Sequence, residues 1–112
     1  MGSSPGGRLP ALDGRDAFEF EADLWRYPGE GGWHFVTLPG GLSDEIEQRF
    51  GQGARGFGSI PVEVNIGETR WTTSMFPDKK AAAYLLPVKA AVREVEGLAD
   101  GERVSLRIRV VI

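Results

Sequence analysis

Apolar and polar residues alternate along four stretches of the chain, and a period of two predicts half-buried β-strands. The stretches run from Phe18 to Leu24, from Ile60 to Ile66, from Trp71 to Met75 and from Val104 to Ile112. Gly67 and Glu68 separate the second stretch from the third, and a two-residue connection with glycine first is typical of a tight β-hairpin. Two shorter apolar runs, Trp33 to Leu38 and Ala82 to Leu86, are predicted as further strands.

The segment 42–51 predicts a short helix, because three apolar residues recur at helical spacing: Leu42, Ile46 and Phe50. Ser43 is the expected N-cap, and Gly51 the expected end. Asp44 and Glu45 then fall in the first turn, where the helix dipole favours carboxylates. We therefore interpret these acidic residues, together with Glu47, as partners of the dipole and not as acid–base catalysts.

The segment 87–97 predicts a second short helix. Pro87 suits the first helical position, since its missing N–H costs nothing there. Gly97 is expected to end the helix. The apolar stripe comprises Val88, Ala91, Val92 and Val95.

Each predicted helix follows an apolar strand through a Leu-Pro pair. The pairs are Leu38-Pro39 and Leu86-Pro87, which lie 48 residues apart (86 minus 38). Neither strand–helix–strand unit can bury its apolar faces alone, so we expect the two to close one core around an approximate two-fold axis. The alternative is a chance similarity of two common units. The predicted fold is mainly β: a small closed or double-split β-barrel with two short capping helices, spanning residues 17–112 after a disordered tail, residues 1–16.

The composition limits the class of protein. A chain of 112 residues corresponds to one domain. It contains no cysteine, which excludes disulfides and thiolate catalysis and is compatible with a cytoplasmic location. No apolar run is long enough for a membrane helix, and the first 17 residues lack the hydrophobic segment of a signal peptide. We predict a soluble and monomeric domain without a cofactor.

The distribution of charge bears on nucleic-acid binding. The chain has 13 basic and 16 acidic side chains, a net charge of −3, although its C-terminal half is the more basic. Phosphate contacts need clustered Lys and Arg, so the overall charge disfavours a nucleic-acid partner. Arg103, Arg107 and Arg109 share the outer face of the last predicted strand. Two interpretations stay open: a charged sheet edge that discourages association, or contact with nucleic acid.

Five pieces of the chain carry a resemblance to a known family: FEFEADLW, GGWHFVTLP, IPVEVNIGETRWTTSMFP, YLLPVKAAVREVEGL and DGERVSLRI. Together they resemble the bacterial DUF1905 family from Phe18 to Ile112. The residues that match its Tyr-x-Leu-Pro-x-Lys and glycine-containing motifs are Tyr84, Leu86, Pro87, Lys89, Gly97, Gly101 and Val104. The loop before Tyr84 departs from the pattern, since it lacks the expected glycine. The resemblance implies a single-chain double-split barrel and no established activity.

A more distant resemblance involves the second Leu-Pro unit, LPVKAAVREVEGLADGERVSL. It is similar to the swapped-hairpin, AbrB-type domains of bacterial regulators and antitoxins. That resemblance implies DNA binding only by analogy of fold, which is a weak argument for function.

Lys89 is the most notable polar residue, because it follows Leu86-Pro87 at the predicted helix start, where free N–H groups favour anions. Arg93 lies four residues later on the same helical face. The candidate site for a small anionic ligand comprises Lys89, Arg93, Lys79, Lys80, Arg70 and Tyr84. The alternative is a solvated basic face.

The other motifs support simpler interpretations. The GQGARG segment, residues 51–56, matches a dinucleotide fingerprint in letters, but it follows a helix and precedes a strand, so we interpret it as a flexible connection. His34, the only histidine, lacks a visible catalytic or metal-binding partner and is interpreted as structural or solvent-facing. The serines lack a nucleophile-elbow motif. Aromatic residues expected in the core or at the barrel mouth, or else stacking on a ligand, are Trp25, Tyr27, Trp33 and Trp71.

Three functions therefore remain. The first is a noncatalytic binding or accessory domain for a small anionic ligand or a protein partner. The second is a nucleic-acid-binding regulator, and the third is an unrecognised enzyme that would combine His34, Tyr84 or a carboxylate with Lys89.

Overall fold

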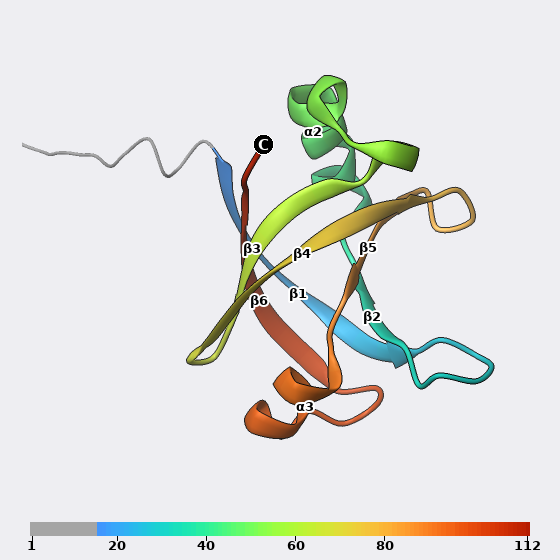
Figure 1. Cartoon of the computed structure of the whole chain (residues 1–112), viewed down its shortest axis with the longest axis vertical. Coiled ribbons are helices and arrows are strands. Elements are labelled where there is room, and N and C mark those ends of the chain that lie inside the picture. Colours follow the sequence, from blue (N-terminus) through green and yellow to red (C-terminus); the bar gives the residue numbers. More distant parts are fainter. Residues whose placement is uncertain (1–15) are drawn as a thin grey trace, which may run out of the picture.

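The computed structural model describes residues 16–112, and its six strands close into one barrel (Figure 1). The elements are β1 (Ala17–Arg26), β2 (His34–Thr37), α2 (Gly40–Phe50), the 3-10 turns η2 (Gly51–Gly53) and η3 (Gly56–Gly58), β3 (Ile60–Ile66), β4 (Thr69–Asp78), β5 (Ala83–Pro87), α3 (Ala90–Glu96) and β6 (Arg103–Val110). The strands follow the order β1-β2-β5-β4-β3-β6, and every neighbouring pair is antiparallel. The predicted closed, mainly β barrel with two short helices is confirmed. Of the predicted tail, residues 1–15 lie outside the described part of the chain.

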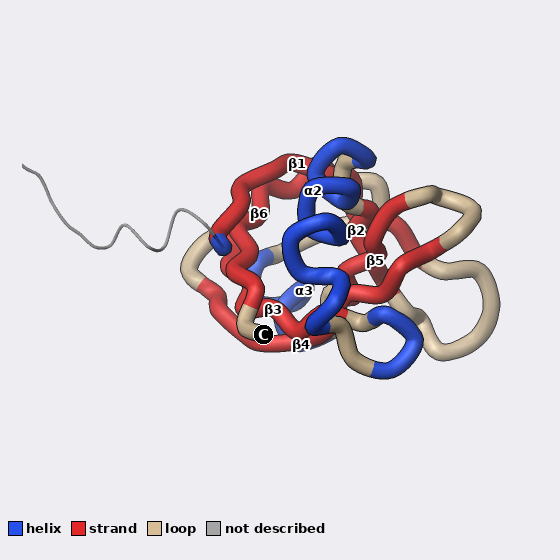
Figure 2. Tube along the Cα trace, turned by 90° about the horizontal axis from the view of Figure 1, so that it is seen from above, coloured by secondary structure: helices blue, strands red, loops and turns tan. Residues whose placement is uncertain are grey.

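The order of the strands contains the predicted two-fold relation. Exchanging β1 with β4, β2 with β5 and β3 with β6 leaves every neighbour in the ring unchanged. The two helices correspond in the same way, because α2 connects β2 to β3 and α3 connects β5 to β6. They lie at opposite ends of the barrel (Figure 1), and a view from above shows α2 across the opening (Figure 2). No helix of the described residues is long and apolar enough to cross a membrane.

The barrel interior is filled by every second residue of each strand. From β3 and β6 these are Ile60, Val62, Val64, Ile66, Val104, Leu106, Ile108 and Val110. Ile46 of α2 and Val92 of α3 belong to the same buried cluster. Burial of each aliphatic side chain contributes about 1.5–3 kcal/mol, so alternation is the main source of stability. The predicted last strand extends too far, since β6 ends at Val110 and the side chain of Ile112 is 49% exposed.

The predicted β3–β4 hairpin is present. Ile66 pairs with Thr69 across Gly67 and Glu68, and Gly67 has a φ of +57°, a conformation that favours glycine. The Thr69 hydroxyl donates a hydrogen bond of 2.6 Å to Glu96 Oε2, which fixes the end of α3 against this hairpin.

The start of the first helix is a correction. Helix α2 begins at Gly40 with Pro39 as its N-cap, so Ser43 is not the cap and the first turn contains no acidic residue. Ser43 is instead buried, and its hydroxyl accepts a hydrogen bond from the backbone N–H of Tyr84. The Ser43 hydroxyl oxygen, predicted to cap its own helix, therefore accepts a hydrogen bond from β5 instead.

The start of the second helix is also a correction. Pro87 ends β5, and α3 begins three residues later with Lys89 as its N-cap. The chain stays extended because Pro87 pairs with Phe35 and the N–H of Val88 donates to His34 O at 2.9 Å. The helix is consequently short, and Val95, predicted on its apolar stripe, is 74% exposed.

Candidate binding surface

The structure distributes the predicted anion-binding residues over both ends of the barrel. Lys79 and Lys80 lie in the turn between β4 and β5, where Lys79 lines a hollow of about 240 Å³ beside Glu47 of α2. Lys89 and Arg93 lie at α3, at the other end (Figure 1). The length of β5, five residues or roughly 17 Å, separates the two pairs.

Arg70 and Tyr84 occupy two further environments. Arg70 Nη1 lies 3.8 Å from Glu63 Oε2 on the outside of the barrel. Tyr84 is only 5% exposed and lines the hollow beside α2. The Arg93 side chain donates a hydrogen bond from Nε to Val88 O at 3.1 Å. The six residues therefore do not converge on one site, and anion binding by any of them stays a prediction.

The environment of Tyr84 changes its acidity. Burial raises the pKa of the Tyr84 hydroxyl above its ordinary value of 10.0, and the negative charge of Glu47 raises it further. A raised pKa means that the folded chain holds this proton more tightly than the unfolded chain. The resulting stability is fully present below pH 10, the unfolded value, and is lost as the pH rises through the folded pKa.

We expect a titration to detect this shift. The chain has two tyrosines, so in a Tyr27→Phe variant the phenolate absorbance reports Tyr84 alone. Its midpoint should lie above 10, and adding Glu47→Gln should lower it, because the carboxylate no longer opposes the phenolate. A midpoint at or below 10 in the folded protein would contradict the burial of this hydroxyl.

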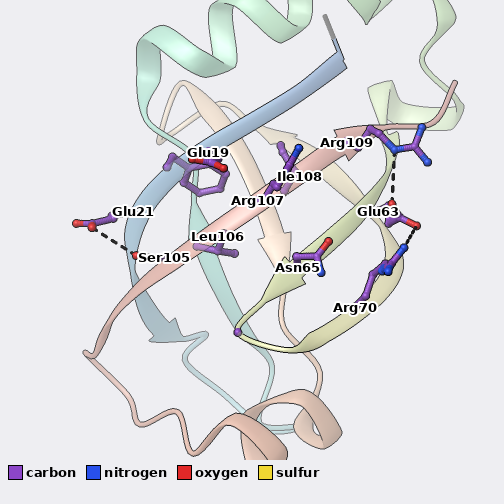
Figure 3. Close-up of a pocket in the computed structure, with 12 residues that line it drawn as sticks. Glu19, Glu21, Glu63, Asn65, Arg70, Ser105, Leu106, Arg107, Ile108 and Arg109 are labelled. Carbon is purple, nitrogen blue, oxygen red and sulfur yellow. Dashed lines mark hydrogen bonds and ion pairs between the residues drawn. The ribbon is translucent and has the colours of Figure 1, made fainter. Parts of the chain in front are cut away.

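A groove of about 1100 Å³ lies on the outside of β1, β6 and β3 (Figure 3). Its walls carry three carboxylates and three guanidinium groups: Glu19, Glu21, Glu63, Arg70, Arg107 and Arg109. Glu63 lies between two of these arginines, with Oε1 3.5 Å from Arg109 Nε. Arg107 is the register partner of Glu19. The charges balance, so the groove offers no excess of cations to a polyanion.

The arginines of β6 do not lie on a sheet edge, which corrects one of the two interpretations from the sequence. Strand β6 pairs with β1 on one side and with β3 on the other. Arg103 contacts both Glu21 and Asp23 of β1, each at 3.3 Å. Exposed ion pairs of this kind contribute only about 0–1 kcal/mol each, but they occupy the guanidinium groups that a phosphate backbone would need.

The opposite outer side of the barrel is rich in aromatic and apolar side chains. We call it the aromatic face, and it consists of Trp25, Tyr27, Trp33, Phe35, Phe76, Leu85 and Pro87 on β1, β2, β5 and β4. The strand register makes it continuous, because Trp25 pairs with Phe35, Phe35 with Pro87, and Phe76 with Leu85. Tyr27 lies opposite Trp33, to whose carbonyl its N–H donates at 2.8 Å. Three of these side chains are largely exposed: Trp33 at 61%, Tyr27 at 52% and Phe76 at 45%.

Three rings of the aromatic face lie close to one another. The Trp25 and Phe35 centroids are 5.4 Å apart at 37°, and those of Tyr27 and Phe35 are 6.0 Å apart at 73°. The Trp25 indole N–H donates to Thr37 Oγ1 at 2.9 Å, which fixes its ring. Among residues 16–112, the Trp33 indole N–H and the Tyr27 hydroxyl have no hydrogen-bond partner.

Lys89 lies at the rim of the aromatic face. The hydrogen bond from Val88 N to His34 O continues the β2–β5 register past Pro87, so Lys89 comes opposite Trp33. Its extended backbone, φ −71° and ψ 159°, places its side chain on the same side as that of Pro87. Lys89 is exposed and forms no ion pair within the described residues. An available positive charge therefore borders the exposed indole.

His34 is buried beneath the aromatic face, next to Trp33 in the chain. The ring is 7% exposed, with Nδ1 2.7 Å from Gly32 O and Nε2 2.5 Å from Asp100 Oδ1. These contacts connect the residue before Trp33 to the turn between α3 and β6. His34 is thus buried and structural, and the described residues contain no group of three potential ligands for a metal.

The fold and its surfaces define a small closed β-barrel domain with an ion-paired outer side and an aromatic outer side. A family model described as domain of unknown function (DUF1905) matches residues 20–108, most of the chain. The chain belongs to this family, as its sequence motifs predict. No curated protein matches it. The similarity to AbrB-type domains stays a prediction.

The loop before Tyr84 lacks the glycine expected from the family pattern, but its backbone has a glycine-like conformation. Ala82 has a φ of +52°, in the left-handed region that glycine adopts without strain. The loop therefore keeps a conformation that suits glycine although alanine occupies the position.

Proposed function

We propose that the chain is a noncatalytic domain that binds a cytoplasmic protein partner through the aromatic face. The observation that carries this proposal is the continuous set of aromatic and apolar side chains on one outer side of the barrel, of which Trp33, Tyr27 and Phe76 are exposed. Contiguous exposed apolar patches are uncommon on monomeric proteins and mark interaction sites. Tryptophan and tyrosine are also the residues that most often dominate binding energy at interfaces.

The shape of the surface favours a protein over a small molecule. Small ligands bind in concave sites that enclose most of their surface. The two concave sites described above lie elsewhere. One is the charged groove, and the other is the hollow between α2 and the β4–β5 turn. The aromatic face instead offers an open surface that spans four strands, which suits a partner with an extended contact area.

The two alternatives have less support. A nucleic acid would need free clustered cations, but Arg70, Arg103 and Arg109 lie in ion pairs with carboxylates. The enzyme hypothesis combines His34 or Tyr84 with Lys89, but both ring nitrogens of His34 contact oxygen atoms, and Tyr84 lies in the hollow beside α2, at the other end of the barrel from Lys89.

The proposal predicts that peptides selected from a displayed random library will bind the aromatic face. We expect selected peptides to lose at least about tenfold in affinity for a Trp33→Ala variant, as for a central interface residue. Phe57→Ala is the matched control, because Phe57 is fully exposed in η3, outside the aromatic face. Thermal unfolding of all variants should match the wild type. Selected peptides that bind Trp33→Ala and wild type equally would refute the proposed surface.

A further inference from the structure

We propose that the aromatic face takes an extended, proline-rich segment with an acidic residue beside Lys89. This inference rests on the proposed function and specifies the chemistry of its partner. A polyproline II segment has no internal hydrogen bonds, so its carbonyl groups are free acceptors, and its stiffness reduces the entropy lost on binding. Three features of the face favour such a segment over other peptide conformations.

The first feature is that the strands beneath the face offer no free backbone. The barrel is closed, and β2 and β5, at the centre of the face, each pair with a strand on both sides. A partner therefore cannot extend the sheet by adding a strand, because that mode needs an edge with unpaired N–H and C=O groups. Recognition must come from the side chains.

The second feature is the arrangement of rings and donors. The neighbouring rings of Trp25, Tyr27 and Phe35 offer apolar surface against which proline rings can pack. The Trp33 indole N–H and the Tyr27 hydroxyl, without partners among the described residues, can donate to the free carbonyls of an extended segment. Proteins that recognise proline-rich segments recurrently use aromatic side chains for the contact.

The third feature is the charge at the rim. Lys89 is exposed opposite Trp33, and no carboxylate of the described residues neutralises it. An acidic residue next to the prolines would complement this ammonium group. On β1, by contrast, Asp23 is engaged by Arg103, so that side of the face offers no comparable attraction for a cation. The charge distribution thus favours one acidic residue at the Trp33 end of the segment.

The test uses three blocked synthetic peptides, in which one oligoproline is preceded by Glu, Gln or Lys. Binding is followed by NMR through the indole N–H signals of the three tryptophans. We expect the Trp33 signal to move most, because the Trp25 indole is already bonded to Thr37. Affinity should fall from Glu to Gln to Lys by roughly twofold to fivefold per step, as for an exposed ion pair. A Lys89→Glu variant should reverse the order, and Trp33→Ala should weaken all three peptides.

The outcomes separate this inference from the proposed function. If library peptides bind through Trp33 while no oligoproline does, the function stands and the proline-rich class is wrong. If the oligoprolines bind with equal affinity whatever the first residue, the role of Lys89 is wrong. If neither class of peptide binds the aromatic face, the proposed function itself fails. Arg26→Glu, an exposed charge reversal at the end of β1, controls for changes in net charge alone.

Discussion

Replacing Ile108 with alanine should lower the free energy of unfolding by about 3–4 kcal/mol, the largest effect that we expect from one substitution in this chain. Ile108 is completely buried at the middle of β6, between Phe18 of β1 and Val64 of β3. The substitution removes apolar contacts and leaves a cavity that the closed ring of strands cannot easily fill. Because small domains are stable by only about 5–15 kcal/mol, such a loss is a large fraction of the total.

Urea unfolding followed by tryptophan fluorescence measures this effect, since Trp71 is part of the buried cluster. Val95→Ala is the control, because it also shortens an aliphatic side chain but at a position that is 74% exposed. We expect the control to stay within about 0.5 kcal/mol of the wild type. Equal destabilisation by the two substitutions would contradict the placement of Ile108 at the centre of the core.

Most of the fold could be predicted because a closed barrel has one inside and one outside. Each strand then presents alternate residues to the core, and buried and exposed residues alternate clearly along β3 and β6. The duplicated Leu-Pro units indicated the approximate two-fold relation between the halves of the barrel. The helix starts could not be predicted, because tertiary contacts decided them: Ser43 bonds to Tyr84 of β5, and Pro87 remains in the β2–β5 ladder.

The aromatic face could be predicted from the sequence only in part. Trp25 lies on the outer side of the barrel and not in the core, where we expected it, although it shares the parity of the exposed residues Glu19, Glu21 and Asp23. At the start of β2 this signal fails, because the exposed Trp33 directly precedes the buried His34, the reverse of the usual preference. The proximity of Lys89 to Trp33 depends on the pairing of β2 with β5, two strands far apart in the sequence. Lys89 could therefore be recognised as unusual, but not as a neighbour of the aromatic residues.

The second large effect concerns the contact between α2 and the barrel. We expect Ser43→Ala to lower the free energy of unfolding by about 1–3 kcal/mol, the usual consequence of leaving a buried donor without a partner. Ser43 is 3% exposed, and its Oγ accepts the Tyr84 N–H at 3.0 Å. Alanine fills nearly the same space, so the loss would reflect the hydrogen bond and not a cavity.

Two measurements distinguish this hydrogen bond from a general weakening of α2. Native-state hydrogen exchange of the Tyr84 amide should accelerate in Ser43→Ala, whereas exchange in β3 should follow only the change in global stability. Ser105→Ala is the matched control, because the Ser105 hydroxyl is exposed and its hydrogen bond to Glu21 Oε2 is long, at 3.4 Å. Its unfolding should differ from the wild type by less than about 0.5 kcal/mol. If Ser43→Ala unfolds like Ser105→Ala, the hydrogen bond from the Tyr84 N–H to Ser43 does not contribute to stability, and the prediction is wrong.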